Sequence, residues 1–174
     1  EILEKFILSL EAIKDIEIIF SREEELLGSG GGIKNALPFF NNQPFYILNS
    51  DSIFVDKDKN NSSFKQLEVS WDPKKASMLL LLSKKEKSFG YWEKGDFNIE
   101  TDSKINQVAE TRQYIYSGMA LIDQRLFEHL PSESVAFPID FKVLMQKNCL
   151  RGIIYDGNWY HIGDLKAFNE FSGF

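Results

Sequence analysis

The chain has 174 residues, a length that accommodates one sizeable folded domain rather than two. Hydrophobic residues make up 43% and aromatic residues 14% of the composition, so the chain can form a packed core and is not disordered. The net charge of −6 and the pI of about 5.0 argue against nucleic acid as a partner, because nucleic acid requires a basic surface. They do not exclude a single nucleotide, whose charge a loop or a metal ion can neutralise.

Cys149 is the only cysteine, so no disulfide can form within the chain and a reducing compartment fits the sequence. Its position between a predicted helix and a predicted strand favours a structural role. The longest apolar run, residues 78–82, is too short to cross a bilayer, and the acidic start of the chain lacks the basic region of a secretory signal. We therefore expect a cytoplasmic protein with no membrane partner.

The first third of the chain predicts a strand, a loop, a helix and a second strand. Apolar side chains recur at helical spacing over residues 2–10, and residues 15–20 are typical of a strand. A glycine-rich turn over residues 28–32 precedes a short predicted helix, residues 33–40. Residues 44–49 are apolar on both faces, as in a buried parallel strand. This order indicates a βαβ unit.

The rest of the chain continues the alternation of strands and helices. Gly118 lies inside one predicted strand and indicates a bulge or the close approach of a ligand. The alternation predicts a single α/β domain over residues 1–174, with a mainly parallel sheet and some antiparallel additions. The predicted helices are 64–71, a helix from about 124, 140–146 and a helix from about 164; the predicted strands are 77–83, 89–92, 96–99, 114–122, 150–155 and 159–162.

The glycine run could serve either a ligand or a plain turn. Glycine permits positive φ and removes the side chain that would block a ligand, and a helix that starts after it offers free N–H groups to a phosphate or a base edge. The run is neither a Walker loop nor the dinucleotide fingerprint, because no Gly-Lys-Ser/Thr follows and Ile33 stands where a third glycine is required. A flexible turn therefore stays open as an alternative.

Asp51 follows the second predicted strand, and ligands of open α/β sheets bind at the carboxyl ends of strands. A carboxylate there could hold Mg²⁺, which prefers one or two carboxylates together with phosphate oxygens. The alternative is a turn cap, since residues 49–52 are also good turn formers. The neighbouring glycine run favours the metal.

His161 is a third candidate, as a metal ligand, an acid or base, or a buried structural residue. Asp164, just after it, is typical of a helix N-cap. No serine hydrolase elbow and no zinc-binding spacing of cysteines and histidines is present. The run Glu23-Glu24-Glu25 is typical of a solvated segment before the loop, although one of these acids could reach a base amino group.

Several segments resemble the sugar-1-phosphate nucleotidyltransferases, most closely the N-acetylmuramate-1-phosphate uridylyltransferase and mannose-1-phosphate guanylyltransferase-like branch. The similar segments occur in the family's order and cover nearly the whole chain. They are residues 25–33 (Leu-Leu-x-Thr-Gly-Gly-Gly-Ile/Val), 44–51 (Pro-Phe-x-x-x-Asn-x-Asp), 71–73 with 78–82, 116–119 (Tyr/Phe-x-Gly-Ile) and 157–164 (Gly-x-Trp-x-Asp/His-Val-Gly-Thr).

The resemblance implies a Rossmann-like nucleotide-diphospho-sugar transferase fold and the transfer of a nucleotidyl group from UTP or GTP to a sugar-1-phosphate, as in cell envelope biosynthesis. It implies Mg²⁺ or Mn²⁺ as the cofactor. The implied roles are nucleotide binding for Gly30, Gly31 and Gly32, catalysis and metal binding for Asp51, sugar contact for Ser117 and Gly118, and metal binding for His161.

Two departures from the family pattern stand out. The chain has no Gly-x-Gly-x-Arg segment followed by a lysine, the part that grips the triphosphate in the family, so the sequence predicts an N-terminally truncated domain whose missing part a partner chain or segment supplies. His161 stands where many members have aspartate. The alternative function is therefore a catalytically incompetent nucleotide-sugar-binding remnant or a subunit of a split enzyme. A glycosyltransferase would instead require Asp-x-Asp, which residues 51–53 do not match.

Overall fold

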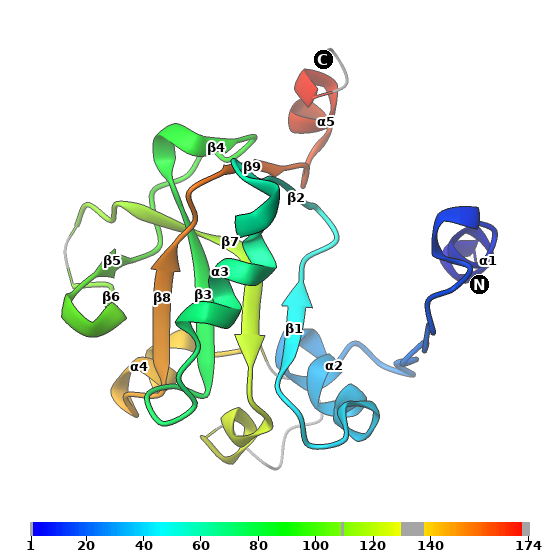
Figure 1. Cartoon of the computed structure of the whole chain (residues 1–174), viewed down its shortest axis with the longest axis horizontal. Coiled ribbons are helices and arrows are strands. Elements are labelled where there is room, and N and C mark those ends of the chain that lie inside the picture. Colours follow the sequence, from blue (N-terminus) through cyan, green and yellow to red (C-terminus); the bar gives the residue numbers. More distant parts are fainter. Residues whose placement is uncertain (1, 109, 130–137, 172–174) are drawn as a thin grey trace.

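The structure is a computed structural model and describes residues 2–108, 110–129 and 138–171 (Figure 1). Its α-helices are α1 (Ile2–Leu8), α2 (Gly28–Ala36), α3 (Ser63–Ser70), α4 (Phe141–Gln146) and α5 (Leu165–Phe171). Its strands are β1 (Phe45–Leu48), β2 (Ser52–Val55), β3 (Met78–Lys84), β4 (Ser88–Phe89), β5 (Asn98–Ile99), β6 (Ile105–Asn106), β7 (Tyr114–Ile122), β8 (Leu150–Ile154) and β9 (Asn158–His161). Short 3-10 segments are Glu11–Ile13, Leu37–Phe40, Lys59–Asn61, Lys85–Lys87, Thr101–Ser103 and Gln124–His129.

A four-stranded sheet in the order β1-β7-β3-β8 forms the centre of the molecule. β7 runs antiparallel to both β1 and β3, whereas β8 runs parallel to β3. β1, β3 and β8 therefore point the same way and end at the same edge of the sheet. A ligand of an open α/β sheet is expected at this carboxyl edge.

The sheet is covered on both faces, and the run of leucines in β3 explains why. Successive side chains of a strand point to opposite faces. Leu80 and Leu82 belong to one buried cluster, against which α2 and α4 pack, while Leu79 and Leu81 belong to a second, which contains Leu67 of α3. Figure 1 shows α3 lying across one face of the sheet. This two-sided burial fits a strand with no polar positions until its end.

A smaller sheet in the order β2-β9-β4 lies at the carboxyl edge of the large one (Figure 1). β9 is its central strand, antiparallel to β2 and parallel to β4. A two-stranded β5–β6 ribbon lies beside β8. The small sheet matters for function because it connects the segment after β1 to the segment before α5.

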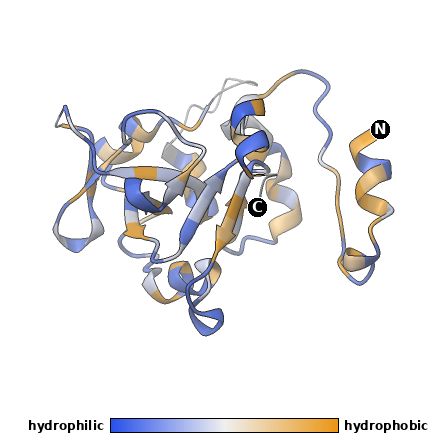
Figure 2. Ribbon diagram, turned by 90° about the horizontal axis from the view of Figure 1, so that it is seen from above, coloured by the Kyte–Doolittle hydropathy of each residue, from blue (hydrophilic) through white to orange (hydrophobic). Residues whose placement is uncertain are grey.

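Helix α1 stands apart from the sheet (Figures 1 and 2). None of its described side chains is buried, and Ile2, Leu3 and Phe6 are all exposed. The guanidinium of Arg22 donates two hydrogen bonds to the carboxylate of Glu4, at 3.0 and 2.9 Å, and so joins α1 to the segment that leads back to α2. No helix within the described ranges is long and apolar enough to serve as a membrane span.

Most predicted elements are present, but three expectations about the first third were wrong. Residues 15–20 form no strand, since they pair with no other described segment, and a strand is stable only within a sheet. The helix begins at Gly28, not at Ile33, so the glycine run is helical rather than a loop before the helix. β1 is an antiparallel strand at one end of the described sheet, with Leu48 half-exposed, rather than a buried parallel strand.

The α/β class is confirmed, whereas the expected predominance of parallel pairing is not. Among the pairings of the large sheet described above, only the one between β3 and β8 is parallel. The strand over residues 114–122 was predicted correctly, but its alternation could not reveal that it runs antiparallel between β1 and β3. The two short strands predicted over 89–92 and 96–99 are reduced to residue pairs in β4 and β5.

Candidate functional site

Asp51 and His161 lie side by side, although they are far apart in the sequence. β2 and β9 pair in antiparallel register, with Ser52 opposite His161. The backbone N–H of Ile162 donates to the carbonyl of Asp51 at 2.7 Å and extends the ladder by one residue. The pairing therefore fixes the backbone of Asp51 against that of His161 at the carboxyl edge of the large sheet.

The two side chains face each other and are partly open to solvent. His161 Nδ1 lies 3.8 Å from Asp51 Oδ2, and the side chains are 30% and 36% exposed. The other carboxylate oxygen, Asp51 Oδ1, is buried and has no hydrogen-bond partner among the described residues. A buried acceptor without a donor destabilises the fold, and such groups in native proteins call for a functional explanation.

Three glycines leave room for this pair. Gly118 has φ +80°, and a Cβ there would lie 2.8 Å from Asn49 Cβ, so its bare backbone lets the segment before Asp51 pack against β7. Gly90, with φ +75°, similarly approaches the carbonyl of His161. A Cβ at Gly163 would lie 2.5 Å from His161 Nε2 and 3.3 Å from Asp51 Oδ2, so this glycine borders both side chains. Sequence reasoning placed Gly163 in a motif but assigned it no role.

A cavity of about 530 Å³ lies beside the end of β1. It joins three of the segments that the motifs singled out, because its lining includes Ser29 of α2, Asn49 after β1 and Tyr116 of β7. The remaining lining residues are Ile33, Ile47, Leu48, Ile139 and Phe141. A concave, mainly apolar site with a few polar groups is typical of small-molecule binding.

The glycine run contributes Ser29 to this cavity, and the nucleotide-binding role that the resemblance implied for Gly30, Gly31 and Gly32 stays a prediction. Gly30 and Gly31 are buried within α2, and the α2 residues that line the cavity are Ser29 and Ile33. Glu23 was missed as a partner of this helix: its Oε2 accepts the N–H of Leu27 at 3.0 Å, and a Cβ at Gly32 would lie 2.5 Å from its Oε1. A carboxylate at a helix N-terminus is stabilised by the free N–H groups there.

Ser117 and Gly118, the residues of β7 that the resemblance implied as sugar contacts, differ in their surroundings. Ser117 is fully buried and its hydroxyl donates to the carbonyl of Leu81 at 2.7 Å, so this side chain points into the core and away from the cavity. Gly118 has a positive φ and lies against Asn49, in the stretch where the register of β7 against β3 shifts, so the predicted bulge is confirmed, while the approach of a ligand stays a prediction. Tyr116, two residues earlier, lines the cavity. The sugar-contact role that the resemblance implied for Ser117 and Gly118 stays a prediction, and of these three residues only Tyr116 lines the cavity.

Cys149 is structural, as expected. Its side chain is buried, and its Sγ donates to the carbonyl of Leu144 at 3.3 Å. Burial raises the pKa of the thiol, which disfavours the reactive thiolate. Asp164 also has the predicted role, since its Oδ1 accepts the N–H of Ala167 at 2.7 Å at the start of α5.

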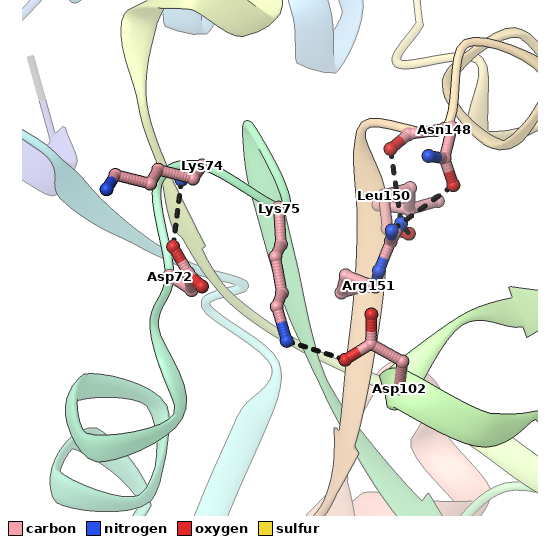
Figure 3. A network of polar contacts seen from close by, with 7 residues as sticks. All are labelled: Asp72, Lys74, Lys75, Asp102, Asn148, Leu150 and Arg151. Carbon is pink, nitrogen blue, oxygen red and sulfur yellow. Dashed lines mark hydrogen bonds and ion pairs between the residues drawn. The ribbon is translucent and has the colours of Figure 1, made fainter.

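A second polar cluster lies at the opposite edge of the sheet, at the amino ends of β3 and β8 (Figure 3). Lys75 points toward Asp102 and their ion pair measures 2.7 Å; this pair lowers the pKa of the Asp102 carboxyl. The buried guanidinium of Arg151 instead donates to Asn148 and to the carbonyl of Leu150. Both signs of charge border the small cavity of about 90 Å³ here, so it favours neither an anion nor a cation.

The structure describes Asp51 and His161 as a pair of candidate metal ligands, with Asp51 Oδ2 and His161 Nδ1 3.8 Å apart. No third histidine, cysteine or carboxylate of the described residues joins them. The pair alone is therefore not a complete metal site, and any ion held there would need further oxygen ligands from water or substrate.

The chain was compared with known protein families, sequences and solved structures. No protein-family model matches the chain. N-acetylmuramate alpha-1-phosphate uridylyltransferase of Caulobacter vibrioides is 24% identical to it over 152 residues, which make up 86% of this chain and 62% of that protein. The chain thus spans less than two thirds of the length of this relative.

Solved structures agree with the sequence relative. HddC from Yersinia pseudotuberculosis, complexed with GMP-PN, matches with a TM-score of 0.65 at 20% identity, over 95% of this chain and 72% of that one. A putative glucose-1-phosphate thymidylyltransferase from Bacillus anthracis, in complex with a sucrose, matches with a TM-score of 0.69 at 16% identity, over 95% of this chain and 68% of that one. The chain has the nucleotide-diphospho-sugar transferase fold.

This assignment confirms the fold and the resemblance that the sequence motifs predicted. In the nucleotide-diphospho-sugar transferase fold adopted here, the segment after β1 and the end of β9 meet at one edge of the sheet. The residues that the resemblance implied as metal ligands, Asp51 and His161, are the ones that meet there.

Proposed function

We propose that the chain is a nucleotidyltransferase domain that transfers a nucleotidyl group from a nucleoside triphosphate to a sugar-1-phosphate. The single observation that best supports the proposal is the contact between Asp51 and His161 at the carboxyl edge of the sheet. Neighbours in the same fold include a uridylyltransferase and a thymidylyltransferase that act on sugar phosphates by name.

In the proposed reaction, an oxygen of the sugar phosphate attacks the α-phosphorus of the triphosphate, the bond to the β-phosphate oxygen breaks, and pyrophosphate leaves. The products are a nucleotide sugar and pyrophosphate. This chemistry needs positioning and charge neutralisation more than a protein nucleophile, and none of the described residues is arranged as one.

Asp51 Oδ2 and His161 Nδ1 would hold Mg²⁺ or Mn²⁺. The ion, when bound, neutralises charge on the phosphate oxygens. His161 makes Mn²⁺ the better fit of the two, because imidazole is a poor ligand for Mg²⁺ and suits softer ions. The chain's own contribution is to fix these two ligands through the β2–β9 ladder and to shape the space in front of them with Gly163.

The cavity beside β1 would bind the nucleoside. Its apolar lining from α2, β1 and Phe141 can cover a base and a ribose, while Ser29 and Asn49 offer polar contacts. Tyr116 lies on the strand that the resemblance assigns to the sugar. The choice between UTP and GTP, and the identity of the sugar, are determined by measuring which substrates the chain accepts.

The test combines turnover with binding. Pyrophosphate release is measured with UTP or GTP, glucose-1-phosphate, mannose-1-phosphate or N-acetylmuramate-1-phosphate, and MnCl₂. Asp51→Asn should abolish release, whereas Asp102→Asn, which changes a carboxylate at the opposite sheet edge, should retain it. Equal activity of Asp51→Asn and wild type would exclude Asp51 from the site.

The alternative is a protein that binds nucleotide sugars without making them. Calorimetric titration with UDP-glucose and GDP-mannose separates the two. Binding without pyrophosphate release supports the alternative and overturns transfer by this chain. Neither binding nor release overturns both.

A further inference from the structure

We propose that Tyr91 is a positioning residue for His161, which it holds in the orientation that presents Nδ1 to Asp51. The contact between Tyr91 and His161 is independent of the proposed function. Its expected consequence, better metal binding, rests on that function. Tyr91 lies outside every motif of the resemblance. Its role follows from the way three aromatic rings meet in the small sheet.

The imidazole of His161 packs against two other rings. The ring centre of Tyr91 lies 6.0 Å from that of His161 at an interplanar angle of 70°, an edge-to-face contact. Trp159, two residues before His161 on the same face of β9, lies 5.6 Å from it at 35°. Tyr91 and Trp159 are themselves 5.8 Å apart. All three separations lie in the range of favourable aromatic pairs, so each ring restricts the other two.

Strand pairing brings Tyr91 to this position. β4 runs parallel to β9 with Ser88 opposite Trp159 and Phe89 opposite Tyr160, which carries the chain toward His161. Gly90 follows with φ +75°, and a Cβ there would lie 2.1 Å from the carbonyl oxygen of His161. Only a glycine permits this approach, after which the chain places the Tyr91 ring against the imidazole.

Tyr91 is itself held at both ends. Its ring packs against the buried cluster that contains Trp159. Its hydroxyl donates to Asp96 Oδ1 at 3.3 Å, and Asp96 Oδ2 accepts the backbone N–H of Tyr116 at 2.8 Å. Burial raises the pKa of the Tyr91 hydroxyl, which therefore stays protonated and able to donate. Tyr91 is partly buried, and these contacts at its ring and its hydroxyl restrict its own movement.

The consequence for His161 is a restricted imidazole. Tyr91 and Trp159 pack against the ring, while Gly163 leaves the Nε2 side without a side chain. An imidazole that kept its orientation would offer Nδ1 to an ion shared with Asp51 at little entropic cost. Loss of Tyr91 should free the ring and remove the advantage that imidazole gives to Mn²⁺ over Mg²⁺.

The first experiment needs no metal and no substrate. The chain has two histidines, so histidine-labelled protein gives two sets of NMR signals, and those of His161 are assigned by their loss in His161→Asp. Three-bond couplings at a fixed pH should report one χ1 rotamer of His161 in wild type and rotamer averaging in Tyr91→Leu. Tyr91→Phe, which keeps the ring, should stay closer to wild type.

Phe89→Leu is the matched control, since Phe89 stacks on Tyr160 with ring centres 4.7 Å apart, on the residue next to His161. This variant also loses an aromatic ring from the small sheet but should leave the His161 couplings unchanged. A single rotamer retained in Tyr91→Leu would overturn the proposal. Equal averaging in Phe89→Leu would overturn it too, because the effect would then be a general loosening of the sheet.

The second experiment measures Mn²⁺ affinity by electron paramagnetic resonance, with Mg²⁺ as competitor. Tyr91→Leu should weaken Mn²⁺ about tenfold, and Mg²⁺ less, so that the preference for Mn²⁺ falls. In a His161→Asp background the same change should leave the preference unaltered; an equal fall there would refute a role through His161. If wild type binds neither ion, the proposed metal role fails, and the couplings alone decide whether Tyr91 positions His161.

Discussion

The replacement Gly163→Ala tests whether the space in front of Asp51 and His161 is part of the site. Gly163 does not have the positive φ that would itself strain a side chain, so alanine adds only a methyl group. That methyl carbon would lie 2.5 Å from His161 Nε2 and 2.7 Å from Cε1, whereas ordinary contacts begin at 3.4 Å. The imidazole must therefore move away from Gly163 by about 0.9 Å, within a space that Tyr91 and Trp159 also restrict.

The cost of this movement can be estimated. An off-rotamer side chain costs about 0.5–1.5 kcal/mol, and an overpacked site about 1–3 kcal/mol. Because Gly163 is exposed, the lower end applies, and we expect a loss of about 1 kcal/mol, or about 2–4 °C in Tm for a domain of this size. A displaced ligand should weaken Mn²⁺ binding by about 10- to 100-fold.

Thermal unfolding and a Mn²⁺ titration by electron paramagnetic resonance check the two effects separately. In a His161→Asp background the ring atoms that meet the methyl group are absent, so Gly163→Ala should weaken Mn²⁺ much less. Wild-type affinity for Mn²⁺ in Gly163→Ala would refute the reasoning. So would an equal loss in both backgrounds, which would place the effect on the backbone and not on the imidazole.

The other predictions concern a ligand, a core hydroxyl and a thiol. Asp51→Asn should lose Mn²⁺ binding in the same titration while its Tm stays within a few degrees of wild type, because the buried Oδ1 has no donor to lose. Ser117→Ala should lower the free energy of unfolding in urea by about 1–2 kcal/mol, since the carbonyl of Leu81 loses a buried donor, and should leave nucleotide-sugar affinity unchanged; a selective loss of affinity would return Ser117 to the ligand site. Cys149 should react slowly with Ellman's reagent at pH 8 and rapidly in denaturant, because burial raises the pKa of its thiol. The raised pKa also means that the neutral thiol contributes to the stability of the folded state. This contribution is present below the ordinary thiol pKa and is lost as the pH rises through the raised value.

The fold was predictable where a segment carries its own signal. The apolar run that became β3 is buried on both sides of the sheet, and its length and composition already indicated this. Gly118 signalled a bulge, and the register of β3 against β7 does shift between Leu80 and Leu82. Such features depend on local chemistry, which a single sequence contains.

Pairing was harder to predict, because direction and partner depend on residues far away. Residues 15–20 have the composition of a strand but no partner among the described segments, and composition alone cannot supply one. The helical start of the glycine run was missed for a related reason. Glycine has a low helix propensity, which argued against a helix here. The carboxylate of Glu23, however, accepts the N–H of Leu27 and supports the first turn.

In the candidate site, too, single residues could be recognised from the sequence, whereas their contacts could not. Asp51 was recognisable because it follows a predicted strand, and His161 was a candidate by residue type, but the resemblance alone paired the two as metal ligands. That the two meet depends on the register of β2 against β9, and a slip of one residue would turn one of the side chains to the other face. Tyr91 had no signal at all, since nothing in its own segment indicates that parallel pairing of β4 with β9 would carry it to His161.

The histidine explains why this site would need such support. A carboxylate can bind an ion through either oxygen and over a broad range of directions, whereas an imidazole binds only in the ring plane and along one nitrogen lone pair. With histidine at position 161, the ring plane must be fixed before the ion arrives, or part of the binding energy is lost in ordering it. Tyr91 and Trp159 restrict the ring of His161, and Gly163 leaves space beside it. Such surroundings suit an imidazole ligand. The same surroundings would be unnecessary for an aspartate, so His161→Asp should make Tyr91 dispensable for metal binding.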